Sequence, residues 1–367
     1  MNALEQLRSA GQSIWLDFLR REIITSGHLD RLRREDAVTG ITSNPTIFNK
    51  AISQGSDYDE AIHALAAAGQ DKPSDIYYDL ALEDVRMSAD VLRPVYDETA
   101  GRDGFISFEL DPALAHDTAG SVTSALALVA RIGRPNIMIK VPGTDEGVVA
   151  VQQLTAMGVN VNITLLFSVQ MYEKVARAYI AGLEDRLRAG MPIAQMASVA
   201  SFFVSRVDTV VDRQLPAGSA SIGKVAIANS KLAYQRFRAI FSGERWERLA
   251  LSGAAPQRVL WASTGTKNPA YSDVLYVEEL VGPETVNTMP EKTLEAFRDH
   301  GRVRPLAVTD GVGDASAILA GLDAQGVNLD TVTGQLLADG LRAFTADLDE
   351  LLRVIEQKGL EVRAGRS

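Results

Sequence analysis

One lysine stands at the end of an apolar run, where its type and position suggest carbonyl chemistry. In "PNIMIKVPGTDEG" (Pro135–Gly147), apolar and β-branched residues lead to Lys140, and a proline and a glycine follow at once. The continuous run predicts a strand buried on both faces, and the cluster after it predicts a turn into a helix N-terminus. Burial favours the neutral amine of Lys140, which attacks carbonyls and can form a Schiff base. The alternative is a lysine that extends to solvent or pairs with a carboxylate.

Other residues able to do chemistry also stand at or just after the ends of predicted strands. In chain order these polar residues are Asp17, Asn44, Glu109, Lys140, Asn162, Thr164, Ser201, Arg206, Ser263 and Lys267. Any one of them could be a helix cap, a turn residue or a partner for buried backbone. Seven strands that all end in this way favour a shared site over seven separate caps.

Short apolar runs recur along the chain, and most precede a longer segment with helical spacing. The candidate strands are Ser13–Phe18, Ala37–Thr42, Gly104–Leu110, Asn136–Val141, Asn160–Phe167, Met196–Phe203, Arg258–Thr264 and a weaker Glu284–Pro290. Strands that alternate with helices indicate βαβ units and a parallel sheet. Eight units favour a closed (β/α)8 barrel, whose active site lies at the carboxyl ends of the strands. An open doubly wound sheet is the alternative.

Additional helices account for the length of 367 residues. We expect two helices between Asp57 and Tyr96, one long amphipathic helix over Ser221–Ala250, and a C-terminal helix that ends near Gly359. The apolar stripe of that last helix is Leu341, Phe344, Leu348, Leu351, Leu352 and Ile355. The prediction is a single domain over residues 1–367, with helical insertions at about 55–100 and 215–250 and C-terminal helices at about 312–360.

Composition excludes several classes of function. The formal charge of −10 argues against nucleic acid or an anionic membrane as a generic partner, because both reward basic surfaces. The chain has no cysteine and only four scattered histidines, so we expect no disulfide, no metal site and no cofactor. It shows neither an apolar signal segment nor a stretch of roughly 20 apolar residues, which predicts a soluble, cytoplasmic protein. Nothing in the sequence identifies a protein partner.

Three motifs carry a family resemblance. "GITSNPTIF", "IKVPGTDEG" and "NVNITLLFS", in this order and spacing, resemble the transaldolase family, and "YVEELVGPETVNTMP" resembles its longer, actinobacterial-type branch. The resemblance covers nearly the whole chain, from Asp17 to the C-terminal helix. It implies a TIM barrel of the class I aldolase type with a Schiff-base lysine at Lys140. It also implies a transferase of the pentose phosphate pathway, which moves a dihydroxyacetone unit between sedoheptulose 7-phosphate or fructose 6-phosphate and glyceraldehyde 3-phosphate or erythrose 4-phosphate.

The resemblance also implies roles for single residues. Asp17 matches the general base of the family, and Glu109 and Thr164 match the pair that holds a water for proton transfer. The implied binding residues are Asn44, Asn162, Ser201, Arg206, Ser263 and Lys267. Arg206 matches the arginine that binds the substrate phosphate. The chain departs from the shorter branch after the seventh strand, where "ASTGTKN" offers Lys267 in place of a second arginine.

Two other functions fit much of the same pattern. A fructose 6-phosphate aldolase would use the same lysine and release the three-carbon unit as dihydroxyacetone. Such relatives resemble much shorter chains and usually carry a tyrosine at the position of Glu109, so chain length and Glu109 both favour transfer. A non-catalytic barrel scaffold would be marked by loss of Lys140 or Asp17, and both residues are present.

Overall fold

Eight strands form the centre of the molecule. The computed structural model of the chain describes residues 2–364, and side chains to residue 360. The strands are β1 (Gln12–Leu16), β2 (Val38–Thr42), β3 (Phe105–Glu109), β4 (Ile137–Pro142), β5 (Val161–Leu166), β6 (Ser198–Phe203), β7 (Arg258–Ala262) and β8 (Thr285–Met289). Neighbours in sequence pair in parallel, and β8 closes the ring on β1. The (β/α)8 barrel is therefore confirmed. The open sheet is excluded, because a closed ring leaves no sheet edge unpaired.

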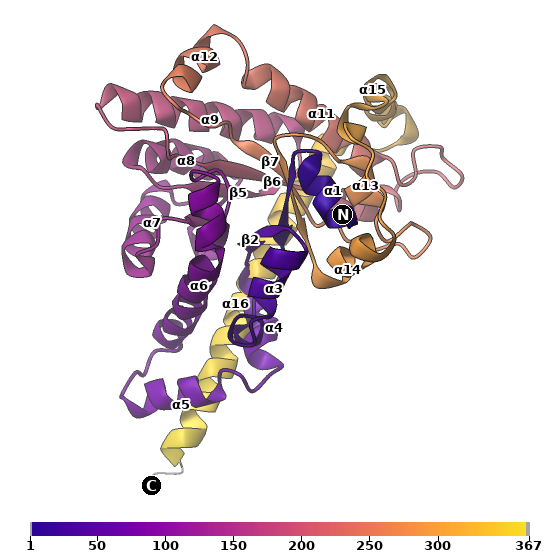
Figure 1. Cartoon of the computed structure of the whole chain (residues 1–367). Helices are drawn as coiled ribbons and strands as arrows, with labels where there is room; N and C mark the ends of the chain where they lie inside the picture. Colours follow the sequence, from indigo (N-terminus) through magenta and orange to yellow (C-terminus); the bar gives the residue numbers. More distant parts are fainter. Residues whose placement is uncertain (1, 365–367) are drawn as a thin grey trace.

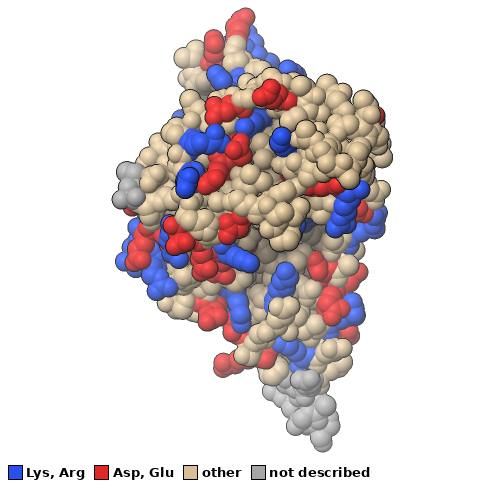
Figure 2. Space-filling model, turned by 90° about the vertical axis from the view of Figure 1, so that its right-hand side faces the viewer, with Lys and Arg blue, Asp and Glu red and all other residues tan. Residues whose placement is uncertain are grey.

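Helices surround the barrel (Figure 1). They are α1 (Ala3–Ser9), α2 (Arg21–Thr25), α3 (His28–Glu35), α4 (Pro45–Ser53), α5 (Asp59–Ala67), α6 (Pro73–Glu98), α7 (Thr118–Ile132), α8 (Asp145–Met157), α9 (Val169–Arg188), α10 (Ser205–Val211), α11 (Val225–Ile240), α12 (Glu244–Leu251), α13 (Leu275–Glu279), α14 (Glu291–His300), α15 (Val312–Ala320) and α16 (Leu329–Ala364). Three 3-10 turns, η1 (Pro112–Leu114), η2 (Ala307–Thr309) and η3 (Asp323–Gln325), lie between them. On the face in Figure 2, basic and acidic side chains are intermixed.

The turn after Lys140 forms as its sequence predicts. β4 ends at Pro142, and Thr144 caps α8 by accepting a hydrogen bond on its hydroxyl oxygen from the Gly147 amide at 2.9 Å. A Cβ atom on Gly147 would lie 2.0 Å from the Pro142 carbonyl oxygen, so only glycine fits there. The amide of Gly143 donates to the Thr164 carbonyl at 2.8 Å, which ties the turn to β5. The cap of α8 and the bond to β5 therefore fix the end of β4, and with it the position of Lys140.

The single helix predicted for Ser221–Ala250 is wrong. The structure has two helices, α11 and α12, separated at Gly243, which adopts a left-handed φ of 79°. The break lets Trp246 pack edge-on against Phe241, with ring centroids 4.8 Å apart. Both rings belong to a small apolar cluster beside α9. Burial of Trp246 against this cluster stabilises the break more than a continuous, solvent-facing helix could.

The C-terminal helix is present, but its predicted end at Gly359 is wrong, because α16 continues to Ala364. The predicted stripe is confirmed, since Phe344, Leu348, Leu351 and Ile355 are buried and Leu341 and Leu352 pack partly buried against the core. Gly359 lies near Ala66 of α5, and Lys358 binds Asp59 of the same helix. These contacts with α5 hold the helix past a residue that would end it in isolation.

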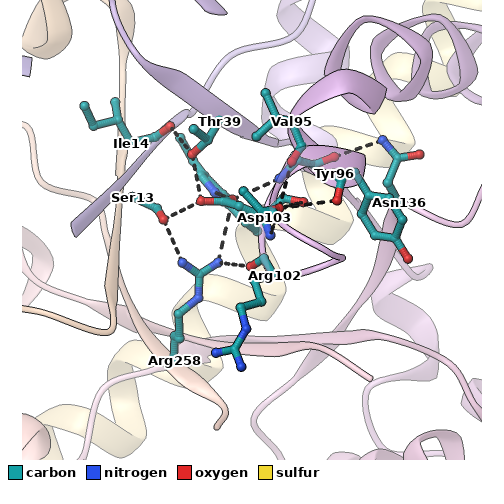
Figure 3. A network of polar contacts seen from close by, with 12 residues as sticks. Ser13, Ile14, Thr39, Val95, Tyr96, Arg102, Asp103, Asn136 and Arg258 are labelled. Carbon is teal, nitrogen blue, oxygen red and sulfur yellow. Dashed lines mark hydrogen bonds and ion pairs between the residues drawn. The ribbon is translucent and has the colours of Figure 1, made fainter. Parts of the chain in front are cut away.

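A polar network closes the amino-terminal end of the barrel (Figure 3). The Asp103 carboxylate accepts hydrogen bonds from Ser13, from Trp15 Nε1 at 2.8 Å and from Thr39 Oγ1 at 2.9 Å. Arg258 of β7 lies 3.6 Å from the same carboxylate and donates to Ser13 Oγ at 2.7 Å. One buried acid therefore connects β1 and β2 with β7.

Loss of this acid should destabilise the fold. Asp103→Ala leaves the Trp15 donor unpaired and Arg258 without its counter-charge, so we expect a loss of about 3–5 kcal/mol in the free energy of unfolding. Urea denaturation monitored by circular dichroism measures it. Asp97→Ala removes an exposed carboxylate whose partner among the described residues is Arg93, and it should change stability by less than about 0.5 kcal/mol. Equal stability of the two variants would contradict the assignment.

Candidate active site

A cavity of about 450 Å³ opens at the carboxyl ends of the strands. Eight of the ten predicted site residues line it, namely Asp17, Asn44, Lys140, Thr164, Ser201, Arg206, Ser263 and Lys267. The other two, Glu109 and Asn162, are buried directly behind it and bond to lining residues. Side chains from six strands or the segments that follow them therefore meet in one cavity.

Lys140 is buried at this end of the barrel and is paired. Its Nζ donates to Oε2 of Glu109 at 2.9 Å and to the backbone carbonyl of Ser43 at 3.0 Å. The register of β3 with β4 sets Glu109 directly beside Lys140, and each side chain is 4% exposed. The amine therefore does not extend to solvent. Pairing with a carboxylate, which the sequence left open, is what the structure has.

Two carboxyl groups accompany the amine at this end of the barrel. Asp17 follows β1 and lines the cavity, where its Oδ1 accepts a hydrogen bond from Thr42 Oγ1 at 2.7 Å. Burial raises the pKa of Asp17, and the Thr42 hydroxyl and the Lys140 charge oppose that rise. Burial also raises the pKa of Glu109, against the lowering effect of Lys140. Both carboxyl groups are therefore better proton acceptors than an ordinary surface acid.

Asn162 lies on β5 in register with Lys140. Its Nδ2 donates to Ser107 Oγ at 3.0 Å, and its Oδ1 accepts from Ser201 Oγ at 2.6 Å. Because the side chain is fully buried, these two bonds fix its amide plane beneath the cavity floor. Asn162 does not itself line the cavity. It is connected to the cavity through its hydrogen bond with Ser201, which is a lining residue.

Two other lining residues keep polar groups unused. Thr164 is fully buried, and within residues 2–360 its hydroxyl has no hydrogen-bond partner. Asn44 caps α4, since its Oδ1 accepts from the Ile47 amide at 2.9 Å, while its Nδ2 makes no hydrogen bond to any described side chain or backbone group. A buried hydroxyl without a partner is unfavourable, so water or a ligand is expected at Thr164.

The cations Arg206 and Lys267 also line the cavity. Arg206 lies in the first turn of α10, with its guanidinium carbon 5.0 Å from the ring centre of Phe203. Ser263 bonds to Ser205 at 2.9 Å, Oγ to Oγ, and so joins the segment after β7 to this turn. Among the described residues, neither Arg206 nor Lys267 forms an ion pair. In an acidic chain, two such cations in one cavity favour an anionic ligand.

Sequence reasoning missed several contributors. Lys50 and Phe344 also line the cavity, and the Ser43 carbonyl accepts from Lys140. The sequence did hold a signal for Lys50. The predicted site residue Asn44 precedes a helix, and in that helix Lys50 lies four residues after Thr46, so both side chains share the face that lines the cavity. No local signal marks Phe344, because it looks like any other member of its apolar stripe.

Comparison with known proteins gives the family. A family model described as Transaldolase/Fructose-6-phosphate aldolase matches residues 14–355. The chain belongs to this family. It is 48% identical to a protein named Transaldolase of Saccharopolyspora erythraea, over 97% of each chain. It is 45% identical to a protein named Transaldolase 2 of Nostoc sp., over 98% of each chain. The transaldolase resemblance of the three motifs is thus confirmed, and the cavity lies where members of a barrel family carry their active sites.

The Thr42 bond gives a direct test of the electrostatics in this family member. Thr42→Val removes a hydroxyl that lowers the pKa of Asp17, so that pKa should rise further above the ordinary value of about 4. As pH falls, the variant therefore protonates Asp17 sooner than the wild type does. A carbon-13 NMR titration of the aspartate carboxyls measures the change, with the Asp17 signal assigned by Asp17→Asn. Replacement of the exposed Thr345 of α16, Thr345→Val, is the control, and an unchanged or lower pKa in Thr42→Val would contradict the geometry.

Proposed function

We propose that the protein is a transaldolase that transfers a dihydroxyacetone unit through a Schiff base on Lys140. Its substrates are sugar phosphates, with sedoheptulose 7-phosphate or fructose 6-phosphate as donor and glyceraldehyde 3-phosphate or erythrose 4-phosphate as acceptor. The observation that carries the proposal is a buried lysine amine held by Glu109, in a cavity that is also lined by Asp17 and by the cations Arg206 and Lys267, which form no ion pair among the described residues. The names of the relatives support the same activity.

Formation of the Schiff base needs three proton movements. The ammonium of Lys140 must lose a proton, and Glu109 at 2.9 Å is placed to accept it, directly or through a water. The amine then attacks the ketone carbon C2, and one of its protons moves to the C2 oxygen to give a carbinolamine. Loss of the C2 oxygen as water, with a proton returned from Glu109, gives the iminium. We assign Thr164 to hold that water, because its buried hydroxyl has no partner among the described residues.

Cleavage of the carbon–carbon bond follows. Asp17 takes the proton of the C4 hydroxyl, the C3–C4 bond breaks, and its electron pair neutralises the iminium to give an enamine. The aldehyde leaves with the phosphate, and a second aldehyde reacts with the enamine by the reverse steps. The raised pKa of Asp17 suits a base that must accept and then return a proton. Hydrolysis of the new iminium releases the product ketose and restores Lys140.

We assign the remaining site residues to substrate binding. We assign Asn44, Asn162 and Ser201 to the hydroxyl groups of the retained three-carbon unit. Arg206 and Lys267 bind the phosphate of whichever sugar is present, and Ser263 supports them through its bond to Ser205. This division keeps the carbonyl end of a ketose at β4 and the phosphate end beyond β6 and β7.

We also propose that the reaction runs in the cytoplasm, since charged sugar phosphates do not cross membranes unaided. No helix within residues 2–364 is both long and apolar enough to span a membrane. The intermixed charges in Figure 2 and the net charge of −10 support the proposal that nucleic acid is not a partner.

One assay tests the function. The protein is given fructose 6-phosphate with and without erythrose 4-phosphate, and products are separated by chromatography. A transaldolase converts the two substrates together into sedoheptulose 7-phosphate and glyceraldehyde 3-phosphate, and makes almost no free dihydroxyacetone. Dihydroxyacetone that accumulates without an acceptor would show an aldolase. No conversion in either condition would show a non-catalytic barrel.

The two carboxylates should have separable effects on oxygen exchange. In ¹⁸O-labelled water, reversible iminium formation replaces the C2 oxygen of fructose 6-phosphate even when no carbon–carbon bond breaks. Asp17→Asn should keep this exchange and lose transfer by about a hundredfold or more, because Asp17 acts after the iminium exists. Glu109→Gln should slow both processes. Lys140→Arg gives the background rate, and mass spectrometry of recovered substrate measures the label. An Asp17→Asn variant without exchange would contradict these roles.

Loss of Arg206 or Lys267 should weaken the binding of phosphorylated sugars and not that of unphosphorylated sugars. Loss of a charge-assisted hydrogen bond weakens binding by roughly 1.5–3 kcal/mol, or about ten- to a hundredfold. Arg206→Ala and Lys267→Ala should therefore raise KM for fructose 6-phosphate and leave kinetics with fructose nearly unchanged. Arg206 should matter more, because its planar fork can bind two phosphate oxygens. Equal losses with both sugars would indicate structural damage instead of phosphate binding.

A further inference from the structure

Helix α16 crosses the mouth of the barrel and contacts both sides of the cavity. Gly340, Phe344 and Asp347 lie on one face of it, at spacings of four and three residues. Phe344 lines the cavity. On one side Asp347 accepts hydrogen bonds from Thr46 and Asn49 of α4. On the other side Gly340 lies against β5 and α10.

The Gly340 contact is unusually close. A Cβ atom at this position would lie 2.8 Å from Leu165 Cδ2 and 3.6 Å from Nη1 of Arg206. The first distance is shorter than side-chain atoms tolerate, so any larger residue must displace either Leu165 or the helix. Leu165 has little freedom to move, because it is 1% exposed and its backbone holds a left-handed φ of 57°. Displacement of α16 would remove the surface that lies beside the Arg206 guanidinium.

A second glycine of the same helix provides the contrast. Gly334 is exposed, and a Cβ atom on it would meet nothing within 4 Å. Glycine inside a helix is about 1 kcal/mol less favourable than alanine, so each of these residues weakens α16. Of these two positions, only Gly340 is packed so closely that a side chain would not fit.

We propose that Gly340 is a positioning residue for the phosphate end of the site, where its missing side chain lets α16 lie against Arg206 and orient the guanidinium. Phe344 then forms the apolar wall between this end and α4. The inference rests on the proposed function, because it assigns Arg206 to the sugar phosphate. It predicts a selective loss for phosphorylated substrates, without loss of the carbonyl chemistry at Lys140.

The test compares four variants, Gly340→Ala, Gly340→Val, Gly334→Ala and Gly334→Val. The readout is kcat/KM with fructose 6-phosphate divided by kcat/KM with fructose. Gly340→Ala should lower this ratio about tenfold through KM, and Gly340→Val should lower it further, because its extra carbons reach towards Arg206. Both Gly334 variants should keep the wild-type ratio. Circular dichroism melting confirms that each variant folds, and Gly340→Ala alone carries the test if the valine variant does not fold.

A second-site change separates positioning from general damage. Leu165→Ala removes the Cδ2 atom that overlaps with the new Cβ, so in the Gly340→Ala background it should restore most of the lost ratio. If Gly340→Ala folds and keeps the wild-type ratio while the wild type transfers normally, the inference is wrong and the proposed function stands. If the wild type itself does not transfer the three-carbon unit, both are wrong.

Discussion

The burial of one charge pair constrains the whole active site. Lys140 and Glu109 are each 4% exposed and lie 2.9 Å apart, so their charges are removed from water and depend on each other. A buried ion pair contributes little net stability, because the loss of hydration offsets the attraction between its members. Its retention inside the barrel therefore points to chemistry. A proton that can pass from the amine to a carboxyl with a raised pKa leaves a neutral nucleophile at the place where a ketone must bind.

The charged groups at the two ends of the barrel have different surroundings. At the amino-terminal end, Asp103 satisfies donors from three side chains and lies beside Arg258, so that network is closed and structural. At the carboxyl end, the Thr164 hydroxyl and the charges of Arg206 and Lys267 have no partner among the described residues. Of these groups the Thr164 hydroxyl is fully buried, and a buried hydroxyl without a partner is unfavourable until water or a ligand completes it. The Asp103 network therefore has a structural role, and the cations at the other end remain available to a ligand.

The sequence predicted the barrel well for a physical reason. Parallel strands buried on both faces must be continuous apolar runs, and even the weak candidate at Glu284–Pro290 corresponds to β8. The ten predicted site residues meet because strand ends in a closed barrel converge on one opening. Features set by distant contacts were not predictable from local sequence. The helix break at Gly243 depends on Trp246 meeting Phe241, and the continuation of α16 past Gly359 depends on α5. Phe344 lines the cavity only because α16 returns across the barrel mouth.

The central claim is that Lys140 is the residue that becomes covalently attached to the substrate. Borohydride reduces an iminium to a stable secondary amine, so treatment in the presence of fructose 6-phosphate should fix the three-carbon unit on the protein. Peptide mass spectrometry should then find one reduced dihydroxyacetone unit, located on the peptide that contains Lys140. The account predicts near-complete labelling of Lys140 and none in a Lys140→Arg variant. Labelling of another lysine, such as Lys267 or Lys50, or intact protein without any adduct, would contradict it.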